Sequence, residues 1–478
     1  MTAEERVDVG VIGAGPAGVV AAVRAARLGA RTALVSRDAV GGMAAADGPV
    51  PVRTLAQAAR LRREARHLQR FGIGMSDAVL DYGQLLDRVR GVVAEVSQHS
   101  LLRDELTDHG VLLHEHVGRA RFVDPHTIEA GQGTRLRADK IILCAGGTNR
   151  ALPVPGAELA GSHRDAWTLT AVPESLLVIG AGATGVQVAS VFAELGSQVS
   201  LFEAGPRILA TEDEDVSRAM AAAFRATGIV VREGFGRIRG FEKAPAGVRM
   251  IFAKDDVVDS VQATLAIAAI GWLADTAGLN LAAAGVATTD RGYVQVDEQL
   301  RTTAPHIFAA GDITGRLMLV PHAVQDGYLA ATNAVQDRGA TLTPQVSPIG
   351  SFTDPEYAQV GPTEAQARRD HDVVVASVPF ATTARPIIDG RTGGFCKLIV
   401  DRGTHRMLGC HVVGERAVEI IQVAAVAIAA AMPVEHFVRI PLSFPTYTNV
   451  LGRAVLDAAR QLDVSDFWDA PEPATRST

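Results

Sequence analysis

The stretch VDVGVIGAGPAGVVAAVRAARLGARTALVS, residues 7–36, decides the fold. An apolar run typical of a buried strand leads into the turn GAGPAG at 13–18, and an alanine-rich helix pattern and a second apolar run follow. In such a turn one glycine makes the bend, one lets backbone approach a pyrophosphate, and the third lets the helix pack on the strand. The helix N-terminal amides then face the phosphates. The stretch therefore predicts a dinucleotide-binding βαβ unit.

A second unit of the same kind follows in SLLVIGAGATGVQVASVFAELGSQVSLFEAGPRIL, residues 175–209. Its second strand ends in Glu203, 18 residues after Gly185, where a carboxylate can accept hydrogen bonds from both ribose hydroxyls. That carboxylate would repel a 2′-phosphate, which favours NADH over NADPH, although the nearby Arg207 works against this preference. One such turn alone also fits a mononucleotide or S-adenosylmethionine site. Two in one chain favour a flavoenzyme that binds two dinucleotides.

Composition limits the other possibilities. The chain has 478 residues, long enough for about three domains, with 47% apolar and 21% charged residues. A net charge of −7 gives no reason to expect a nucleic-acid or anionic-membrane partner. The start MTAEERVDVG lacks the features of a signal peptide, and the apolar stretches 176–195 and 418–432 do not fit a transmembrane span. We expect a soluble cytoplasmic protein.

The three cysteines, Cys144, Cys396 and Cys410, lie in apolar, strand-like runs. No two of them have CxxC or CxxxxC spacing, and an odd count argues against a disulfide framework. Each is therefore predicted to be a buried, inert thiol. The histidines form no convincing ligand set, so no metal site is predicted.

Further motifs occur in a consistent order along the chain: IILCAGG (141–147), AIAAIGWLADTAGLNL (266–281), GYVQVDEQLRTTAPHIFAAGDITG (292–315), MLVPHAVQDG (318–327), FTDPEYAQVGPTEAQA (352–367) and GCHVVGERAVEIIQVAAVAIAA (409–430). With the two glycine turns, they resemble the class I pyridine nucleotide–disulfide oxidoreductases, the group of dihydrolipoamide dehydrogenase, mercuric reductase and glutathione reductase. The resemblance covers nearly the whole chain. It implies an α/β fold with two doubly wound, Rossmann-like domains, one for FAD and one for NAD, and a C-terminal α+β domain that forms a homodimer.

The implied domains are 1–150 and 275–345 for FAD, 151–274 for NAD(P), and 346–478 for the dimer interface. In the last of these a strand-rich stretch is expected to precede one buried helix. The residues expected at FAD are Gly13, Gly15, Pro16, Ala17, Gly18, Ser36, Arg37, Gly42, Arg53, Gly146, Gly311, Asp312, Met318 and Leu319. Those expected at NAD are Gly180, Gly182, Ala183, Thr184, Gly185, Glu203 and Gly271.

The reacting groups depart from the family pattern. Where the family has two cysteines after a pair of glycines, alignment on Gly41 and Gly42 gives Ala44 and Pro49. Where it has a C-terminal His and Glu that act as acid and base in the partner's site, this chain has Phe444 and Asn449. Neither can shuttle a proton at neutral pH. The sequence therefore predicts that the chain is not a disulfide reductase, and mercuric reduction is excluded with it.

Two further departures concern the flavin. Ser36 replaces the acid that ends the second strand of the first unit, so Ser36 and Arg37 are weaker candidates for the adenosine ribose. Arg53 and Gln187 replace a lysine–glutamate pair beside the flavin. Arg53 fits a flavin-tuning cation, a substrate clamp, or a surface arginine. The arginines that follow it on the same helix are interpreted as a solvated basic face: Arg60, Arg62, Arg63, Arg66 and Arg70.

Three aromatic residues remain as candidates. His322 lies in the segment expected under the flavin ring and fits a proton donor or a structural histidine equally well. Tyr447 follows Pro445-Thr446, and its phenol fits either a proton donor toward the partner's flavin or a packing role. Phe444 would present an aromatic wall suited to a flat or apolar ligand.

These residues lead to a first hypothesis and three alternatives. The first is an FAD-dependent NAD(P)H oxidoreductase that passes electrons from flavin directly to a small non-disulfide acceptor, such as a quinone. The alternatives are a dehydrogenase or reductase of a specific metabolite anchored by Arg53, an NAD(P) transhydrogenase, and a non-catalytic dimeric flavoprotein. Retention of both glycine turns, Asp312 and Glu203 argues against the last of these.

Overall fold

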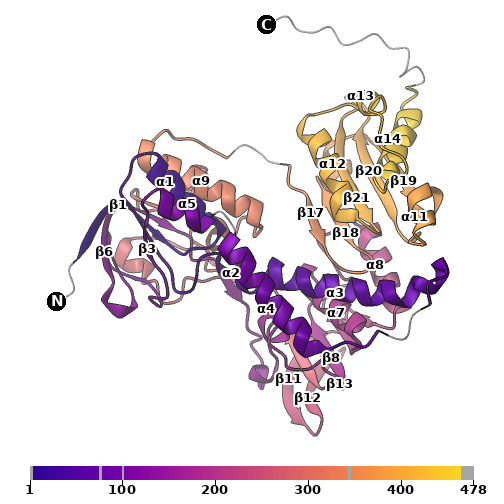
Figure 1. The fold of residues 1–478 in the computed structure, drawn as a ribbon, viewed down its shortest axis with the longest axis horizontal. Coiled ribbons are helices and arrows are strands. Elements are labelled where there is room, and N and C mark those ends of the chain that lie inside the picture. The colour runs from indigo at the N-terminus through magenta and orange to yellow at the C-terminus, as the bar shows by residue number, and fades with distance from the viewer. Residues whose placement is uncertain (1–3, 75–77, 100–101, 343–345, 465–478) are drawn as a thin grey trace, which may run out of the picture.

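The computed structural model describes residues 4–74, 78–99, 102–342 and 346–464. Its sheets form three regions (Figure 1). The expected α/β architecture is confirmed, while the predicted domain boundaries remain a prediction. The end of the predicted interface domain, 465–478, lies outside the described residues.

The first region is a seven-stranded sheet in the order β3-β2-β1-β6-β5-β4, with β16 also paired to β6. Its strands are β1 (Glu5–Ile12), β2 (Thr32–Val35), β3 (Leu112–His114), β4 (Arg121–Asp124), β5 (Thr127–Glu129), β6 (Arg135–Leu143) and β16 (Ile307–Ala309). Helices α1 (Pro16–Arg27) and α9 (Val320–Gln336) pack on one another beside this sheet. Since Ile307 pairs with Ile141, the chain returns to this sheet after building the second region.

The second region contains a four-stranded parallel sheet and a three-stranded antiparallel sheet. The parallel strands are β8 (Ser175–Ile179), β9 (Gln198–Glu203), β10 (Val230–Glu233) and β14 (Leu265–Ala268); the antiparallel ones are β11 (Arg237–Ala244), β12 (Gly247–Lys254) and β13 (Val257–Ala263). Helices α7 (Ala183–Leu195) and α8 (Glu214–Ala226) belong to it, and β7 (Gly147–Asn149) pairs with β15 (Trp272–Ala274) where the chain enters and leaves. The rings of Phe202, Phe235 and Phe252 meet edge to face in its core.

The C-terminal region is an antiparallel sheet in the order β17-β18-β21-β20-β19. The strands are β17 (Ile349–Ser351), β18 (Tyr357–Val360), β19 (Val373–Pro379), β20 (Phe395–Asp401) and β21 (Met407–Val413), with helices α10 (Glu364–Asp370), α11 (Ala384–Ile388), α12 (Ala417–Ala429), α13 (Val434–Phe437) and α14 (Asn449–Gln461). The expectation of one buried helix was wrong, because α14 packs on β19 and β20 as α12 packs on β21. Only the inner face of α14 is apolar, so it lacks the long hydrophobic run that marks α12.

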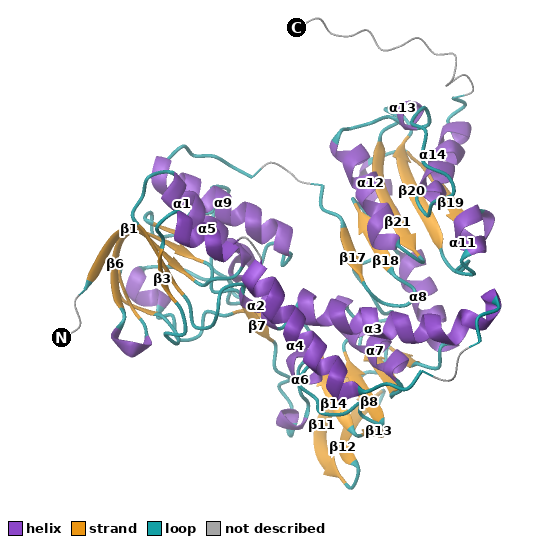
Figure 2. Cartoon of the chain, viewed as in Figure 1, coloured by secondary structure: helices purple, strands orange, loops and turns teal. Residues whose placement is uncertain are grey.

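Extended helices connect the regions (Figure 2). The long helices are α3 (Pro49–His67) and α4 (Tyr82–His99). The short ones are α2 (Gly42–Ala46), which packs on α3 and α4, α5 (Leu102–Asp108), which packs on α1, and α6 (His163–Ala166), which packs on α7. Helix α3 packs against α4 and α7, and Leu55 and Ala59 bury its apolar side.

The basic residues of α3 correct the expectation of a solvated face. Arg60 lies 2.7 Å from Glu415, Arg63 lies 3.2 Å from Asp354, and Arg66 pairs with Glu194. Arg62 donates to the carbonyl oxygen of Glu194 and Arg70 to that of Gly390. The Arg63 side chain is only 11% exposed. These arginines hold α3 to the second and C-terminal regions.

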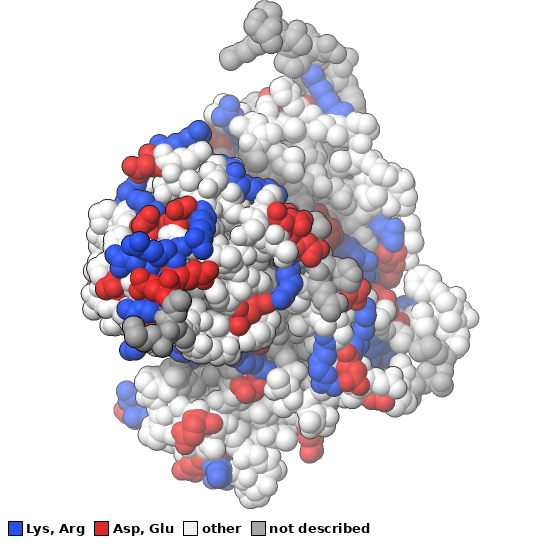
Figure 3. All heavy atoms as spheres, turned by 60° about the vertical axis from the view of Figure 1, so that its left-hand side comes forward, with Lys and Arg blue, Asp and Glu red and all other residues white. Residues whose placement is uncertain are grey.

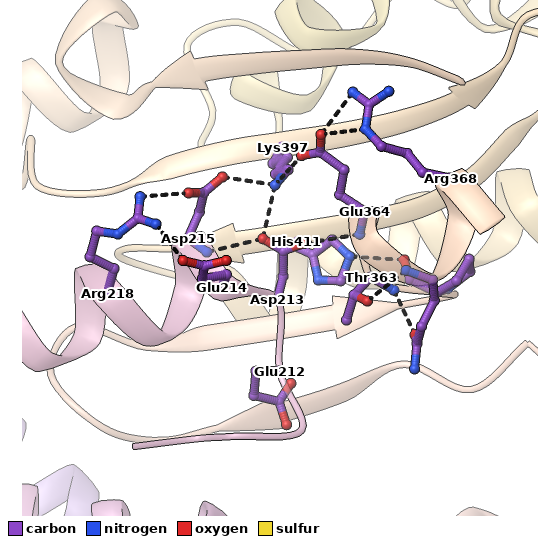
Figure 4. Close-up of polar contacts among 12 residues, drawn as sticks. Glu212, Asp213, Glu214, Asp215, Arg218, Thr363, Glu364, Arg368, Lys397 and His411 are labelled. Atoms are coloured by element: carbon purple, nitrogen blue, oxygen red, sulfur yellow. Dashed lines mark hydrogen bonds and ion pairs between the residues drawn. The ribbon is translucent and has the colours of Figure 1, made fainter. Parts of the chain in front are cut away.

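An ion cluster around the buried Lys397 joins the same two regions from another side (Figure 4). The ammonium of Lys397, on β20, lies 2.9 Å from Asp213, 2.7 Å from Asp215 and 2.6 Å from Glu364. Burial works to lower the pKa of Lys397, but the three carboxylates hold it above its ordinary value. Glu212 points away from the cluster, and burial raises its pKa to about 7.

The outer surface shows acidic and basic side chains interspersed on the face drawn in Figure 3. Across the described ranges, no helix combines the length and the apolar character that crossing a membrane requires.

Candidate functional site

A single cavity of about 940 Å³ lies between the first and second regions. Both glycine-rich turns line it, through residues 15–17, 180 and 182–184. So do three later segments predicted to touch the cofactors, within 269–272, 310–312 and 318–320. The structure therefore brings together residues that lie up to about 300 positions apart in the sequence, and the two predicted nucleotide sites share one space.

The two turns contain glycines of two kinds. A Cβ on Gly18 would lie 1.7 Å from the Gly13 carbonyl oxygen, and a Cβ on Gly185 would lie 1.8 Å from that of Gly180. These glycines let each helix pack against its own strand. A Cβ on Gly15 or Gly182 would meet nothing within 4 Å, because both face the cavity.

The first turns of α1 and α7 are built to receive an anion. Gly15 and Gly182 are their N-caps, no side chain caps either helix, and no acidic residue lies in either first turn. The backbone amides there stay open toward the cavity, where the helix dipole favours a phosphate. This donor set fits the pyrophosphate of FAD at the first turn and that of NAD at the second.

Glu203 lies at the end of β9, beside the second turn. Its carboxylate accepts hydrogen bonds from the Ala181 amide at 2.9 Å and the Gly205 amide at 2.7 Å, and it lines the cavity. Arg207 donates instead to the carbonyl oxygens of Leu209, Ala210 and Glu212. Its guanidinium is thereby held on its own loop.

The cavity is also lined by Gly146, Gly311, Asp312, Met318 and Leu319, five of the residues expected at FAD, and their role there stays a prediction. Burial raises the pKa of Asp312, and the nearby Asp326 raises it further. The Asp312 carboxylate accepts no hydrogen bond from the described residues, which leaves it available to a ligand hydroxyl. Gly42 lies against the first turn, since a Cβ there would be 2.8 Å from the Gly15 Cα. Gly271 lines the cavity near the second turn.

Ser36 and Arg37 do not line the cavity. Ser36 is buried, and its amide donates to the His114 carbonyl oxygen at 2.8 Å. Arg37 pairs with Asp38 at 2.8 Å and with Asp275 at 3.1 Å, and Asp275 also pairs with Arg119. The hydrogen bond to Asp38 raises the pKa of Arg37. The charge of Arg37 is therefore used in ion pairs with Asp38 and Asp275.

Helix α2 and the start of α3 form the wall where the family pattern has cysteines. Met43, Ala44, Gly48 and Pro49 line the cavity, so the two aligned positions do lie together on its surface. No side chain on this wall carries a thiol. The first cysteine in the chain, Cys144, lines the cavity from the opposite sheet but is only 5% exposed. Burial raises its pKa, which suppresses the thiolate.

Arg53 and Gln187 meet at Phe352 instead of lining the large cavity. The guanidinium carbon of Arg53 lies 3.5 Å from the centre of the Phe352 ring, and Gln187 accepts from the Phe352 amide at 3.4 Å. Burial lowers the pKa of Arg53. Arg53 lines a separate cavity of about 230 Å³ together with Glu356 and Glu419.

His322 and Tyr447 are both engaged within the chain. His322 shares a hydrogen bond with Ser347 and does not line the cavity, although its neighbour Ala323 does. The Tyr447 phenol donates to Asp389 at 2.9 Å, and burial raises the pKa of that phenol. This geometry supports the packing alternative for Tyr447.

The two C-terminal replacements differ sharply in exposure. Phe444 is 76% exposed. Asn449 is the first residue of α14, and its side chain accepts a hydrogen bond from the Thr446 amide at 2.8 Å.

The remaining cysteines confirm the prediction of buried thiols. Cys396 and Cys410 are fully buried on neighbouring strands of the C-terminal sheet, with their sulfurs 3.8 Å apart. Among the residues that the structure describes, no three His, Cys, Asp or Glu side chains are arranged to hold a metal ion.

Several cavity residues were not predicted from the sequence, among them Phe235, Arg237 and Trp272. Phe235 and Arg237 flank the start of β11, a strand with no motif of its own. Trp272 lies inside the motif 266–281 and directly follows Gly271, which was expected at NAD. Its place in the cavity could therefore have been predicted from the sequence.

Comparison with known proteins agrees with this arrangement. Residues 7–327 match the pyridine nucleotide-disulphide oxidoreductase family, and residues 347–455 match the dimerisation domain of that family. The chain is 31% identical to a dihydrolipoyl dehydrogenase of Chlorobaculum tepidum over 95% of this chain and 97% of the relative. It is 32% identical to a dihydrolipoyl dehydrogenase of Mycobacterium tuberculosis over 93% of this chain and 96% of the relative.

A solved structure of similar fold is the Cu(II) complex of the HOCl-induced flavoprotein disulfide reductase RclA from Escherichia coli. It has a TM-score of 0.84 and 25% identity over 95% of this chain and 99% of that one. The chain belongs to the pyridine nucleotide-disulphide oxidoreductase family. It is a flavin-dependent pyridine nucleotide oxidoreductase that binds FAD and a pyridine nucleotide and carries the family's dimerisation domain.

Proposed function

We propose that this chain takes hydride from NADH onto FAD and passes the electrons directly to a small non-disulfide acceptor, such as a quinone. The observation that carries the proposal is the wall formed by α2 and the start of α3. Ala44 and Pro49 line the cavity there, and neither carries a thiol that could take electrons from flavin or form a disulfide with a substrate. Relatives named as disulfide reductases share the fold, whereas reaction type depends on the groups at the site.

FAD supplies a carrier that accepts hydride and returns electrons to an acceptor. The residues of this chain would position it. The open amides at the start of α1 hold its pyrophosphate, and the unpaired carboxylate of Asp312 accepts from a hydroxyl of its sugar chain. The amides at the start of α7 and Glu203 hold the nicotinamide dinucleotide at the other end of the same cavity.

Glu203 supports a preference for NADH over NADPH. Its carboxylate is fixed by two backbone amides and faces the cavity, where it would bind ribose hydroxyls and repel a 2′-phosphate. Arg207 does not offset this repulsion, because three carbonyl oxygens already occupy its donors.

The acceptor side supports a flat, apolar partner. Met43, Ala44 and Pro49 form the wall where the family pattern has cysteines, and their apolar surface favours an apolar ring. The exposed Phe444 adds an aromatic surface in the C-terminal dimerisation domain, where the family pattern has a base.

Anaerobic stopped-flow mixing of the FAD-bound protein with NADH tests the proposal. The flavin's visible absorbance should bleach within milliseconds to seconds, without the long-wavelength charge-transfer band of a flavin–thiolate pair. Reoxidation by a quinone should then restore the absorbance, while lipoamide should not. A charge-transfer band or turnover on lipoamide would show that a thiol takes part. Absence of bleaching by NADH and NADPH would favour a non-catalytic flavoprotein.

A further inference from the structure

We propose that Arg237 contacts the adenosine end of the bound dinucleotide and gives this site affinity for a 2′-phosphate. The inference rests on the proposed nucleotide site and goes beyond it, because Glu203 alone predicts rejection of NADPH. Arg237 would make the chain accept both NADH and NADPH, with NADH bound more tightly.

The backbone places Arg237 beside Glu203. The Gly234 amide donates to the Gly205 carbonyl oxygen at 2.8 Å, and the Phe235 amide lies 3.4 Å from the Glu203 carbonyl oxygen. These bonds tie the segment before β11 to the end of β9. Arg237 comes two residues after Phe235, and it lines the same cavity as Glu203 and Ala204. Since the acid at the end of this strand marks the ribose, Arg237 lies at the adenosine end.

The residue before Arg237 helps to hold this position. Gly236 has a φ of +96°, and a Cβ there would lie 2.2 Å from the Ala253 carbonyl oxygen. Only glycine fits this close approach to β12. The turn is therefore built into the sheet, and the first residue of β11 follows directly from it.

Arg237 is also available to a ligand. Among the described residues lining the cavity it is the one cationic side chain, and it makes no hydrogen bond or ion pair within the described chain. Its exposure contrasts with Arg207, whose guanidinium is held by loop carbonyls. An unpaired guanidinium beside a ribose has the charge and the planar donor geometry that a phosphate monoester requires.

Redox-inert fragments test this inference without turnover. The FAD-bound protein is titrated with ADP-ribose and with 2′-phospho-ADP-ribose, and calorimetry gives the two dissociation constants. The native chain should bind both. In Arg237→Gln the affinity for 2′-phospho-ADP-ribose should fall about 10-fold or more, because a charge-assisted hydrogen bond is lost. The affinity for ADP-ribose should change less than about 3-fold.

Arg239→Gln is the matched control. Arg239 lies on the same strand and carries the same charge, but it does not line the cavity, so both affinities should stay at native values. Equal losses for both ligands in Arg237→Gln, or no loss for either, would overturn the inference. A native chain that binds neither ligand would contradict the proposed nucleotide site itself.

Discussion

The guanidinium carbon of Arg53 lies 3.5 Å from the centre of the Phe352 ring, which joins the start of α3 to the C-terminal region. A cation over an aromatic face contributes roughly 0.5–2 kcal/mol, more when the pair is desolvated. Arg53 lies one helical turn beyond Pro49, which lines the flavin-side wall of the large cavity. The side chain of Arg53 therefore joins α3 to the C-terminal region, and its action on the flavin stays a prediction.

Two substitutions separate these roles of Arg53. Arg53→Met removes the charge but keeps the stem, and the flavin midpoint potential should fall by about 30 mV because a cation favours the reduced anion. Phe352→Leu removes the ring and should lower the free energy of unfolding by about 1 kcal/mol, with the potential unchanged. Dye-equilibration titration and urea unfolding measure the two quantities. An unchanged potential in Arg53→Met would limit Arg53 to holding the regions together.

The glycines of the second turn provide a matched pair for a second prediction. In Gly185→Ala the new Cβ would lie 1.8 Å from the Gly180 carbonyl oxygen, so α7 must shift, and we expect a loss of at least about 2 kcal/mol in stability. In Gly182→Ala the Cβ meets no protein atom within 4 Å but occupies the pyrophosphate's approach. Stability should change by less than about 1 kcal/mol, while NADH affinity should fall at least about 10-fold.

Thermal melting and nucleotide titration on both glycine variants check this pair. Native NADH affinity in Gly182→Ala would place the pyrophosphate elsewhere.

Lys397 supports a prediction on stability. Lys397→Met would leave Asp213, Asp215 and Glu364 close together without their shared cation, and we expect a loss of about 3–5 kcal/mol. Arg218→Gln is the control, because the pairs of Arg218 with Glu214 and Asp215 are exposed and should contribute less than about 1 kcal/mol each. Urea unfolding followed by circular dichroism measures both. Equal midpoints for the native chain and Lys397→Met would show that the cluster contributes nothing net.

Glu212 predicts a pH dependence of stability. Burial raises its pKa from 4.5 to about 7 in the folded chain. The unfolded chain releases the Glu212 proton at a lower pH than the folded chain does. The contribution of the protonated Glu212 to stability is therefore complete below pH 4.5 and is lost as the pH rises through about 7. At pH 8, Glu212→Gln should be more stable than the native chain by at most about 3 kcal/mol, and at pH 4 the two should agree.

Melting temperatures across this pH range test the Glu212 prediction. Glu356 shifts in the same direction and for the same reason, so some pH dependence should persist in the variant. The prediction is contradicted if the melting temperature of the native chain, compared with that of Glu212→Gln, rises from pH 5 to pH 8.

Much of the cofactor site could be predicted from the sequence, because its signals are local. The turns at 13–18 and 180–185 each contain, within six residues, the strand end, the bend and the helix start that a phosphate needs. Gly311 and Asp312 come just after the buried strand β16, so their place at its carboxyl end could also be predicted from the sequence.

Other parts depend on distant partners and could not be predicted. Arg60 and Arg63 look like a solvated helix face in sequence, but Glu415 and Asp354 reach them from about 300 residues away. The phenol of Tyr447 donates a hydrogen bond to Asp389, which lies at the end of α11, 58 residues earlier in the sequence. Arg237 lies on a strand without a motif, and only the pairing of residues 234–235 with the end of β9 places it in the cavity.

The pairing of β16 with β6 has a consequence for synthesis of the chain. Residues 141–143 of β6 keep an open edge until residues 307–309 have left the ribosome, so the first sheet cannot be completed while the second region is being made. During that interval the nascent chain exposes a strand edge of the kind that recruits other strands. Fragments that end before residue 307 should therefore aggregate, whereas the second region is encoded by one continuous stretch and has all its strands once residue 268 is made.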